Sequence, residues 1–367
     1  MTETGTLQTT SPTPLAQLLL EAAPAGTRPE LVECHGKRTP KRLDAPEKEI
    51  AALAFGAAVH DLGWLRRVAV RGEDRFRWLN GMVTNAVNDL AGDAGAWNLV
   101  LNAQGRILGD LHVWRDGEML DLVIAADQYE KLLAHLDRFI IMDDVELVPE
   151  NETALGLAGP QAAEMLKKLG LPAPTELLTS IRASWNGEPL RIARAYGALA
   201  PHFELWMQAD QLAALWRALA EAGATPVGAD ALEAFRIAEG IPAYGVDIAE
   251  RDLPQETSQM RSLSFSKGCY LGQEIVERIR SRGSVHRHLR PLELLGPVPA
   301  AGSELTWEGT AAAGLITSAA ELPLTAGTRV FALAMMRGEA ELRSQSFTYK
   351  AGEVAGTARI LTTPPRL

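Results

Sequence analysis

Cysteine is nearly absent from this chain of 367 residues, which contains only Cys34 and Cys269. Two thiols can form at most one disulfide, and neither belongs to a C-x-x-C pair. The sequence therefore excludes a disulfide framework and argues against a zinc or iron-sulfur site built by this chain alone. The N-terminus has no basic flank, and Leu18-Leu19-Leu20 is too short for a signal peptide. We expect a reduced, cytoplasmic protein.

Long apolar runs and an excess of positive charge are also missing. No stretch approaches the roughly 20 apolar residues that a membrane span requires. The net charge is -10 and the sequence pI is about 5.3, which argues against charge-driven binding to nucleic acid or to anionic membranes. An anionic ligand would therefore need a local basic patch.

Size and composition are typical of a soluble protein with two or three domains. The chain is 47% hydrophobic and 22% charged, and its length exceeds that of a usual single core. Residues 1–44 hold a Thr/Ser/Pro-rich segment, a short helical pattern and a basic cluster, which together predict a loosely docked extension. The predicted blocks after this extension are 45–150, 151–228, 229–290 and 291–367.

The pattern of apolar residues predicts an α+β fold with a separate β module. A helix is expected at 46–60, and residues 64–148 then predict strand, helix, three strands, helix and strand. Residues 154–222 repeat this order in coarse form, which indicates two split β-α-β blocks, and a further helix is expected at 229–239. After Pro291, short strands separated by Gly and Pro predict a small all-β barrel or sandwich.

The stretch from Ser266 to Glu274, S-K-G-C-Y-L-G-Q-E, has the residues best placed for chemistry. Cys269 lies between two glycines, close to Lys267, and precedes a helix expected from Gln273 onward. A nearby ammonium and a helix N-terminus would both favour its thiolate. The glycines suggest a tight, exposed loop around the sulfur. The alternative is that Cys269 is a small buried hydrophobe, which is the commonest fate of a free cysteine.

Residues 267–274 resemble the K-G-C-Y-x-G-Q-E signature of the folate-binding YgfZ family, whose relatives are the glycine-cleavage T-protein and a mitochondrial iron-sulfur assembly factor. Weaker matches follow the family's order along most of the chain. They comprise residues 102–111, 229–240, 253–257, 314–318 and 332–335. The resemblance implies a T-protein-like ring of three domains, with two ferredoxin-like blocks, a C-terminal barrel and tetrahydrofolate bound in or near a central channel.

The resemblance also implies a set of ligand-binding residues. Glu239 occupies the family's pterin-contacting acid position, and a carboxylate can accept two hydrogen bonds from the guanidine-like edge of a reduced pterin. Without the resemblance, Glu239 would be interpreted as a surface residue at a helix end. Asp110 follows the turn that lines the folate pocket in the relatives. Arg236 is a candidate for the ligand or for a buried pair with Glu239 or Asp110.

The signature and the basic stretch after it complete the predicted folate site. Between Lys267 and Arg290, six Lys or Arg residues stand against two Glu residues, which reverses the overall charge of the chain. This stretch is a candidate contact for the folate carboxylates, with Arg282 as the expected cation, although a solvated helix would show the same charges. The contacts expected within the signature are Gly268, Tyr270 and Gln273.

No metal site is predicted. His286 and His288 alternate along what would be a strand, so they could share one face. No carboxylate or thiol of suitable spacing stands beside them, which argues against a metal centre.

These features favour a folate-binding protein of the YgfZ type that assists assembly or repair of iron-sulfur clusters, with Cys269 as the reactive group and Lys267 beside it. In that family the clients include radical enzymes that modify tRNA. The implied partners are therefore client or assembly proteins and folate, without direct binding to nucleic acid or membrane. One thiolate cannot hold a cluster. Cys269 would instead supply one ligand to a shared cluster, form a mixed disulfide or attack a damaged sulfur centre.

Two other functions stay open. T-proteins place two consecutive acids after the glycine turn, whereas this chain has Gly109-Asp110. The lost acid and the added cysteine signature both argue against glycine cleavage. The alternative is a folate-dependent one-carbon transferase or demethylase in which Asp110 or Glu239 acts on the substrate. A third function is a folate-sensing interaction protein without chemistry.

Overall fold

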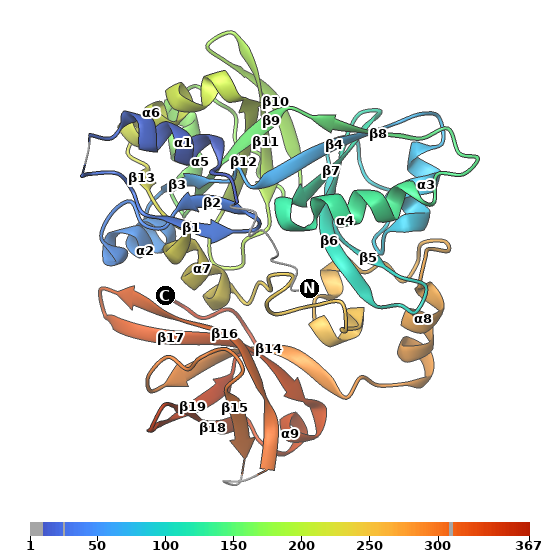
Figure 1. Ribbon diagram of the computed structural model, residues 1–367, viewed down its shortest axis with the longest axis vertical. Helices are drawn as coiled ribbons and strands as arrows, with labels where there is room; N and C mark the ends of the chain where they lie inside the picture. The colour runs from blue at the N-terminus through green and yellow to red at the C-terminus, as the bar shows by residue number, and fades with distance from the viewer. Residues whose placement is uncertain (1–9, 25, 308–310) are drawn as a thin grey trace, which may run out of the picture.

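The computed structural model describes residues 10–24, 26–307 and 311–367. Two open sheets with their helices and one closed barrel surround a common centre (Figure 1). The six-stranded sheet lies at the upper left of this view, the five-stranded sheet at the upper right and the barrel below. The α+β class and the three-part ring that the sequence implies are therefore confirmed.

Residues 65–150 form the five-stranded antiparallel sheet, in the order β5-β6-β7-β4-β8. Its strands are β4 (Leu65–Arg71), β5 (Gly95–Leu101), β6 (Ile107–Asp116), β7 (Met119–Ala125) and β8 (Glu146–Glu150), and its helices are α3 (Arg75–Met82) and α4 (Ala126–Asp137). The apolar faces of the two helices bury Leu79, Leu132 and Leu136 in one core with the sheet. The order of elements predicted for 64–148 is confirmed.

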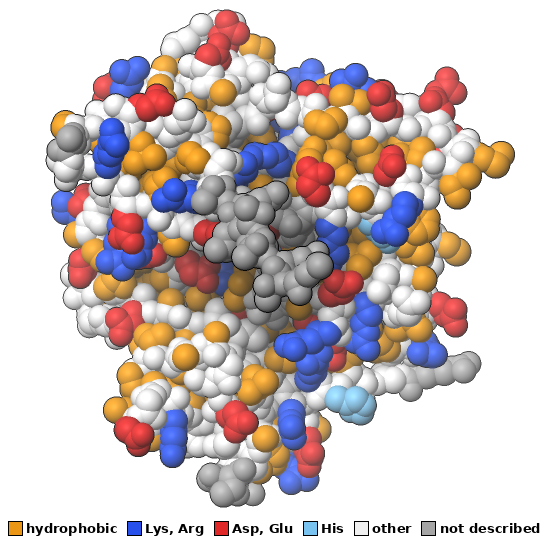
Figure 2. All heavy atoms as spheres, viewed as in Figure 1, with side chains coloured by type: hydrophobic (Ala, Val, Ile, Leu, Met, Phe, Trp, Pro, Cys, Tyr) orange, Lys and Arg blue, Asp and Glu red, His pale blue; other side chains and the backbone are white. Residues whose placement is uncertain are grey.

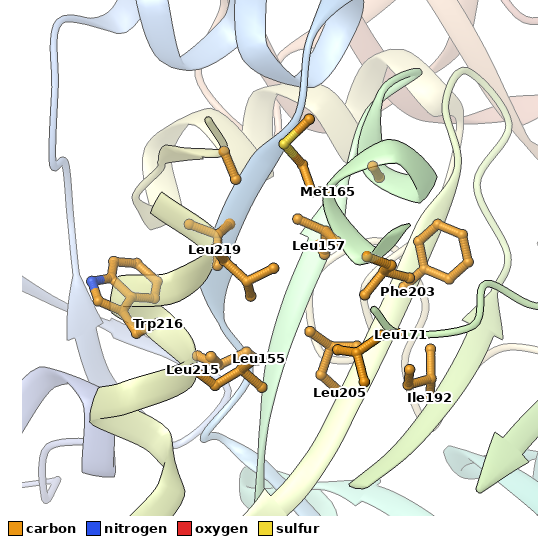
Figure 3. Packing of buried hydrophobic residues seen from close by; sticks show 14 of the residues in the cluster. Leu155, Leu157, Met165, Leu171, Ile192, Phe203, Leu205, Leu215, Trp216 and Leu219 are labelled. Carbon is orange, nitrogen blue, oxygen red and sulfur yellow. The ribbon is translucent and has the colours of Figure 1, made fainter. Parts of the chain in front are cut away.

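The six-stranded sheet has the order β10-β11-β12-β9-β3-β13. Its strands are β3 (Ala58–Asp61), β9 (Glu152–Ala158), β10 (Ser180–Trp185), β11 (Glu188–Ala195), β12 (His202–Gln208) and β13 (Thr225–Pro226), and its helices are α5 (Ala162–Lys168) and α6 (Leu212–Glu221). Figure 3 shows Leu215 and Leu219 of α6 gathered with Leu155 and Leu157 of β9. Strand β10 was not predicted, because this edge strand exposes much of its length and has a weak apolar pattern.

The helix expected at 46–60 is too long. Helix α2 (Pro46–Phe55) ends at Gly56, whose backbone leaves the helical region, and Ala58–Asp61 form β3. The alanine-rich run favours a helix in sequence, but all four residues of β3 are buried and pair with β9. A strand from the predicted block 45–150 therefore belongs to the sheet of the next block.

The N-terminal segment is more firmly attached than the sequence suggests. It forms α1 (Pro14–Ala22) and the hairpin of β1 (Leu31–Cys34) and β2 (Lys37–Pro40). Leu15 is fully buried in the core of the six-stranded sheet. Asp61 of β3 accepts hydrogen bonds from the hydroxyls of Thr13 and Thr39. The prediction of a loosely docked extension is wrong for the described part of this segment.

The C-terminal barrel closes in the order β14-β17-β16-β15-β18-β19. Its elements are β14 (Arg287–Leu295), β15 (Glu304–Trp307), β16 (Ala311–Leu324), β17 (Gly327–Arg337), α9 (Gly338–Arg343), β18 (Ser346–Ala351) and β19 (Val354–Ile360). The hydroxyls of Thr317 and Ser318 on β16 donate to Asp247 of the core. The predicted barrel is confirmed.

Two helices connect the sheets and the barrel. Helix α7 (Ala229–Glu239) has the predicted bounds and ends at Gly240, whose φ of +72° gives the left-handed cap that glycine favours. Short 3-10 turns at Pro254–Thr257 and Met260–Ser262 follow, and α8 (Gln273–Arg282) comes after the cysteine loop. No helix in the described ranges is both long and apolar enough to cross a bilayer.

Candidate functional site

A cavity of about 450 Å³ lies at the centre of the molecule, and we call it the chamber. Its wall combines the β1–β2 hairpin, β3, β6, β12, α7 and the segment after α7. Aromatic side chains line much of it; they are Trp64, Tyr196, Phe235 and Tyr244. The volume and the mixture of aromatic and convergent polar groups are typical of a small-molecule site.

Asp110 of β6 is one of the carboxylates that line the chamber. It accepts hydrogen bonds from Trp97 Nε1 at 2.8 Å and from Gln128 Nε2 at 2.9 Å. Burial raises its pKa, although these two bonds and the nearby His35 oppose the shift. The predicted residue is therefore in the cavity, and its position is fixed by neighbours on β5 and α4.

Glu239, the last residue of α7, also lines the chamber. Its side chain is 1% exposed, so it is not a surface residue at a helix end. The Oε1 atom accepts the backbone N–H of Leu199 at 2.9 Å, and Oε2 lies 3.5 Å from Nε2 of His202. No hydrogen bond within the described ranges ends on Oε2, so this oxygen has capacity to accept from a ligand.

Arg236 reaches the chamber wall but is paired differently from the prediction. Its guanidinium donates to Glu233 at 2.6 Å and to Asp247 at 2.6 Å, and also to the carbonyl oxygen of Ile241. Burial opposes its charge, but the two carboxylates raise its pKa overall. The predicted pair with Glu239 or Asp110 is wrong, since Arg236 instead joins α7 to the segment that holds the barrel.

The cysteine loop displays its thiol at the surface. Cys269 is exposed, so the interpretation as a buried hydrophobe is wrong. The amine of Lys267 turns inward and donates to the carbonyl oxygens of Val83 and Asn85, each at 2.7 Å. Burial lowers the pKa of Lys267 to about 7. The hydrogen bonds of Lys267 therefore fix the loop, and none of them reaches the sulfur.

The two glycines around Cys269 have different roles. At Gly272 φ is +81°, and a Cβ would come within 2.6 Å of the carbonyl oxygen of Asn102, so the tight turn requires glycine there. A Cβ at Gly268 would meet nothing within 4 Å. Cys269 precedes the N-cap residue Gly272 by three positions and stands outside the first turn of α8.

The other signature residues support the loop and do not line the chamber. Tyr270 is 7% exposed, and burial, followed by the nearby Glu277, raises its pKa to about 12. Its ring packs with Trp97 in a small core. Gln273 Oε1 accepts the backbone N–H of Tyr270 at 3.3 Å. Gly268, Tyr270, Gln273 and Cys269 all lie outside the chamber lining.

Arg282 closes α8, and its side chain lies outside the described part of the structure. Neighbouring cations line a crevice of about 1340 Å³ between the barrel and the core, where Figure 2 shows a group of basic side chains. Arg287 pairs with Asp252 and Glu256, and Arg290 with Glu341, so part of the predicted basic character is neutralised.

Sequence reasoning missed Arg261. Its guanidinium stacks on Tyr196 at 3.5 Å from the ring centroid and donates to Gln259 Oε1 at 3.2 Å. Burial lowers its pKa to about 10. Tyr196 and Glu239 line both the chamber and the crevice, so Arg261 lies near the junction of the two. Nothing in the residues around position 261 predicts that Arg261 lies near this junction.

Two more chamber residues were also unassigned by the sequence, Cys34 and His202. Burial, followed by the charge of Glu233, raises the pKa of Cys34 to about 12. In the described ranges, no group of three or more His, Cys, Asp or Glu side chains could hold a metal ion.

Comparisons with known proteins agree with this architecture. The family model described as the GCVT N-terminal domain matches residues 29–267. An aminomethyltransferase from Rubrobacter xylanophilus is 30% identical over 316 residues, which cover 85% of this chain and 84% of the relative. A putative chloroplastic transferase from Arabidopsis thaliana is 25% identical, with 73% of this chain and 63% of the relative covered.

Among solved structures, the glycine cleavage system aminomethyltransferase T from Bartonella henselae superposes with a TM-score of 0.84. The match covers 97% of this chain and 98% of that protein at 19% identity, so it establishes the fold alone. The matched family model and the Rubrobacter relative go further, and they show that the chain belongs to the GCVT N-terminal domain family.

Proposed function

We propose that this protein binds tetrahydrofolate in the chamber and assists assembly or repair of iron-sulfur clusters in client enzymes through Cys269. The observation that carries the folate part is the buried Glu239 carboxylate, whose Oε2 has capacity to accept hydrogen bonds inside an aromatic cavity. A reduced pterin presents adjacent N–H donors on one edge, and a carboxylate is the complementary acceptor. Asp110 supplies a second carboxylate on the opposite block.

The cysteine part of the proposal uses a different region of the molecule. Cys269 is exposed on a loop that Lys267 and Gly272 hold in place, and it does not line the chamber. An exposed thiol on a fixed loop can meet a thiol, disulfide or metal centre of another protein. It would give one ligand to a cluster shared with a client, or form a mixed disulfide in which its sulfur displaces one sulfur of the partner's disulfide as a thiolate.

The test is rescue of cells that lack this protein. The measured quantity is the activity of cluster-dependent enzymes, including radical enzymes that modify tRNA, after return of the wild type, Cys269→Ser or Ser266→Ala at matched expression. Ser266 is exposed in the same loop and does not line the chamber, so we expect the wild type and Ser266→Ala to restore activity and Cys269→Ser to restore less than a tenth of it. Equal rescue by Cys269→Ser would remove the cysteine from the mechanism.

A folate-dependent one-carbon transferase is the second candidate, and the names of the relatives favour it. In this function Asp110, held by Trp97 and Gln128, would act next to the folate ring. Incubation of the pure protein with tetrahydrofolate and a methylated or aminomethylated amine separates the candidates. Methyl-tetrahydrofolate formed from the methylated amine, or methylene-tetrahydrofolate formed from the aminomethylated amine with release of ammonia and the free amine, would favour the transferase if its formation depends on Asp110 and not on Cys269.

A further inference from the structure

A further pocket, of about 640 Å³, lies beside the helix that follows the cysteine loop, and we call it the α8 pocket. Its walls are the turn at 102–106, the segment 284–286 and the face of α8 that carries Ile275, Arg278 and Ile279. These three positions share one face because they are spaced by three and four residues. The α8 pocket adjoins the crevice at 284–286 and shares no described lining residue with the chamber.

Two arginines give the α8 pocket a positive charge that no neighbouring acid compensates. Arg106 donates to the backbone carbonyl oxygen of Arg251, and none of the ion pairs in the described ranges involves Arg106 or Arg278. The acid of the described lining is Glu256, and Arg287 binds both of its oxygens. Two guanidinium groups are therefore available to carboxylates, which they bind well.

Aliphatic side chains form much of the remaining wall. Leu253, Ile275, Ile279 and Val285 line the α8 pocket, and each is partly exposed. A bare phosphate has no group to contact them. Nucleic-acid bases usually stack on aromatic rings, and the described lining of this pocket contains none. A protein segment that carries both acidic and aliphatic side chains fits the two kinds of wall.

The α8 pocket begins where the cysteine loop ends. A Cβ at Gly272 would come within 2.6 Å of the carbonyl oxygen of Asn102 and 3.1 Å of the Cα of Gly105, so the end of the loop rests on the turn that lines the pocket. Cys269 precedes Gly272 by three residues, which limits the distance between their Cα atoms to about 11 Å. One short extended segment can therefore reach both the exposed thiol and the pocket.

We propose that the α8 pocket binds an acidic segment of the partner protein whose sulfur meets Cys269. This inference rests on the proposed function of Cys269. Arg106 and Arg278 bind carboxylates of the segment. An aliphatic side chain between these carboxylates packs on Ile275 and Ile279. The bound segment raises the effective concentration of the partner's sulfur at the thiol, so partners are selected by their charge. Because the arginines are near the surface, this selection weakens as salt is added.

A binding experiment with the full-length Cys269→Ser protein measures the pocket without the thiol. The probe is a fluorescent peptide of Ser, a four-residue Gly/Ser spacer and Glu-Leu-Glu, whose spacer spans about 13 Å when extended. At low salt we expect it to bind at least tenfold more tightly than the peptide that ends in Gln-Leu-Gln. Arg278→Gln should weaken binding of the acidic peptide at least fivefold, and Arg106→Gln with Arg278→Gln should abolish the preference.

The matched control removes the same charge elsewhere. Arg138 and Arg217 are exposed, and each donates to a backbone carbonyl oxygen of its own helical segment, Ala134 and Ala213. Neither lines the α8 pocket. Arg138→Gln with Arg217→Gln should therefore bind both peptides as the protein with all four arginines does.

A kinetic experiment with the intact thiol measures the effect on transfer. The peptides carry Cys in place of Ser, as a mixed disulfide with thionitrobenzoate. The Cys269 thiolate attacks the peptide sulfur, a disulfide forms between them, and thionitrobenzoate leaves as the thiolate of the more acidic thiol. We expect the acidic peptide to react at least tenfold faster than the neutral one, and less than threefold faster in the variant with both Arg106→Gln and Arg278→Gln. Uncharged iodoacetamide should alkylate Cys269 equally fast in both proteins.

The outcomes separate this inference from the proposed function. If the acidic and neutral peptides bind equally, or the double arginine variant keeps the preference, the pocket is refuted while the role of Cys269 stands. If serine replaces the peptide's leucine without loss and inorganic phosphate competes, the pocket takes a bare anion and the peptide is refuted. If Cys269→Ser rescues cells fully while the acidic peptide still binds, the proposed function fails and the pocket stands. Should Arg106→Gln disturb the fold, Arg278→Gln alone decides, because Arg278 is exposed.

Discussion

Burial lowers the pKa values of two chamber histidines and raises those of two chamber carboxyl groups. It lowers the pKa of His60 to about 3, and together with Arg261 it lowers that of His112 to about 4. It raises the pKa values of Asp110 and Glu204. Each of these shifts has the direction that burial imposes on an ionisable group, because the charged form loses more hydration than the neutral form.

His60 makes this effect measurable. It is 5% exposed, and burial, followed by the nearby His202, keeps it neutral in the folded chain down to about pH 3. The unfolded chain binds this proton near pH 6.5, so stability is lost as the pH falls below 6.5. One such group contributes about 1.4 kcal/mol per pH unit, or about 2 kcal/mol between pH 7 and pH 5. Urea unfolding of the wild type and of His60→Gln at both pH values should show the smaller loss for the variant; equal losses would contradict the assignment.

The cysteine loop is attached along its length to the end of α3 and the chain that follows it. Leu271 N donates to the carbonyl oxygen of Gly81, Ser264 N to that of Thr84, and the Thr84 hydroxyl to that of Ser262. Lys267 adds its two bonds from the middle of the loop. The thiol is therefore presented by a fixed backbone, which lowers the entropy lost when a partner binds.

Replacement of this lysine distinguishes a positioning role from thiol activation. Lys267→Met leaves two carbonyl oxygens without their partner, which should cost about 1–3 kcal/mol and speed amide hydrogen exchange in residues 263–272. Lys267→Arg keeps the charge and the N–H donors, so its stability and its exchange rates should lie between those of Lys267→Met and the wild type. Exchange rates and the rate of Cys269 alkylation are the measurements. Slower alkylation with unchanged exchange would instead support direct activation of the thiol by Lys267.

The elements that the sequence predicted well are those whose local signals and packing agree. Helix α7 has an apolar face and glycines at both ends, and its bounds are as predicted. Strand β3 was missed because a run of alanines before it favours helix, while its burial comes from pairing with β9 nearly 100 residues away. The direction of Lys267 could not be predicted either, since its acceptors lie 184 and 182 positions earlier in the chain.

At the scale of the whole molecule, one buried carboxylate joins the core to the barrel. Asp247 is 2% exposed and binds Arg236 of α7, the backbone N–H of Ala243, and the hydroxyls of Thr317 and Ser318 on β16. The barrel also packs its β16 against α2 and α7. The chamber and the crevice therefore depend on this joint for their relative position.

Asp247→Ala should be costly for that reason. It leaves Arg236 and two hydroxyls without their shared acceptor, and loss of one partner of a buried pair costs about 3–5 kcal/mol. Glu233→Ala removes the other, half-exposed partner of Arg236 and should cost under about 1 kcal/mol. Calorimetric unfolding measures both. Similar losses of stability for the two variants would mean that Asp247 does not hold the barrel against the core.

The contrast between the two cysteines has a practical consequence for finding partners. Cys269 is exposed, whereas Cys34 is partly buried in the β1–β2 hairpin with a pKa of about 12. A thiol-directed crosslinker applied at neutral pH therefore attaches at one position of the unmodified chain. Any slower, second attachment takes place at Cys34, so its rate measures how often the hairpin moves away from the chamber. A ligand that prevents attachment at Cys34 without slowing attachment at Cys269 would be bound behind the hairpin and away from the reactive loop.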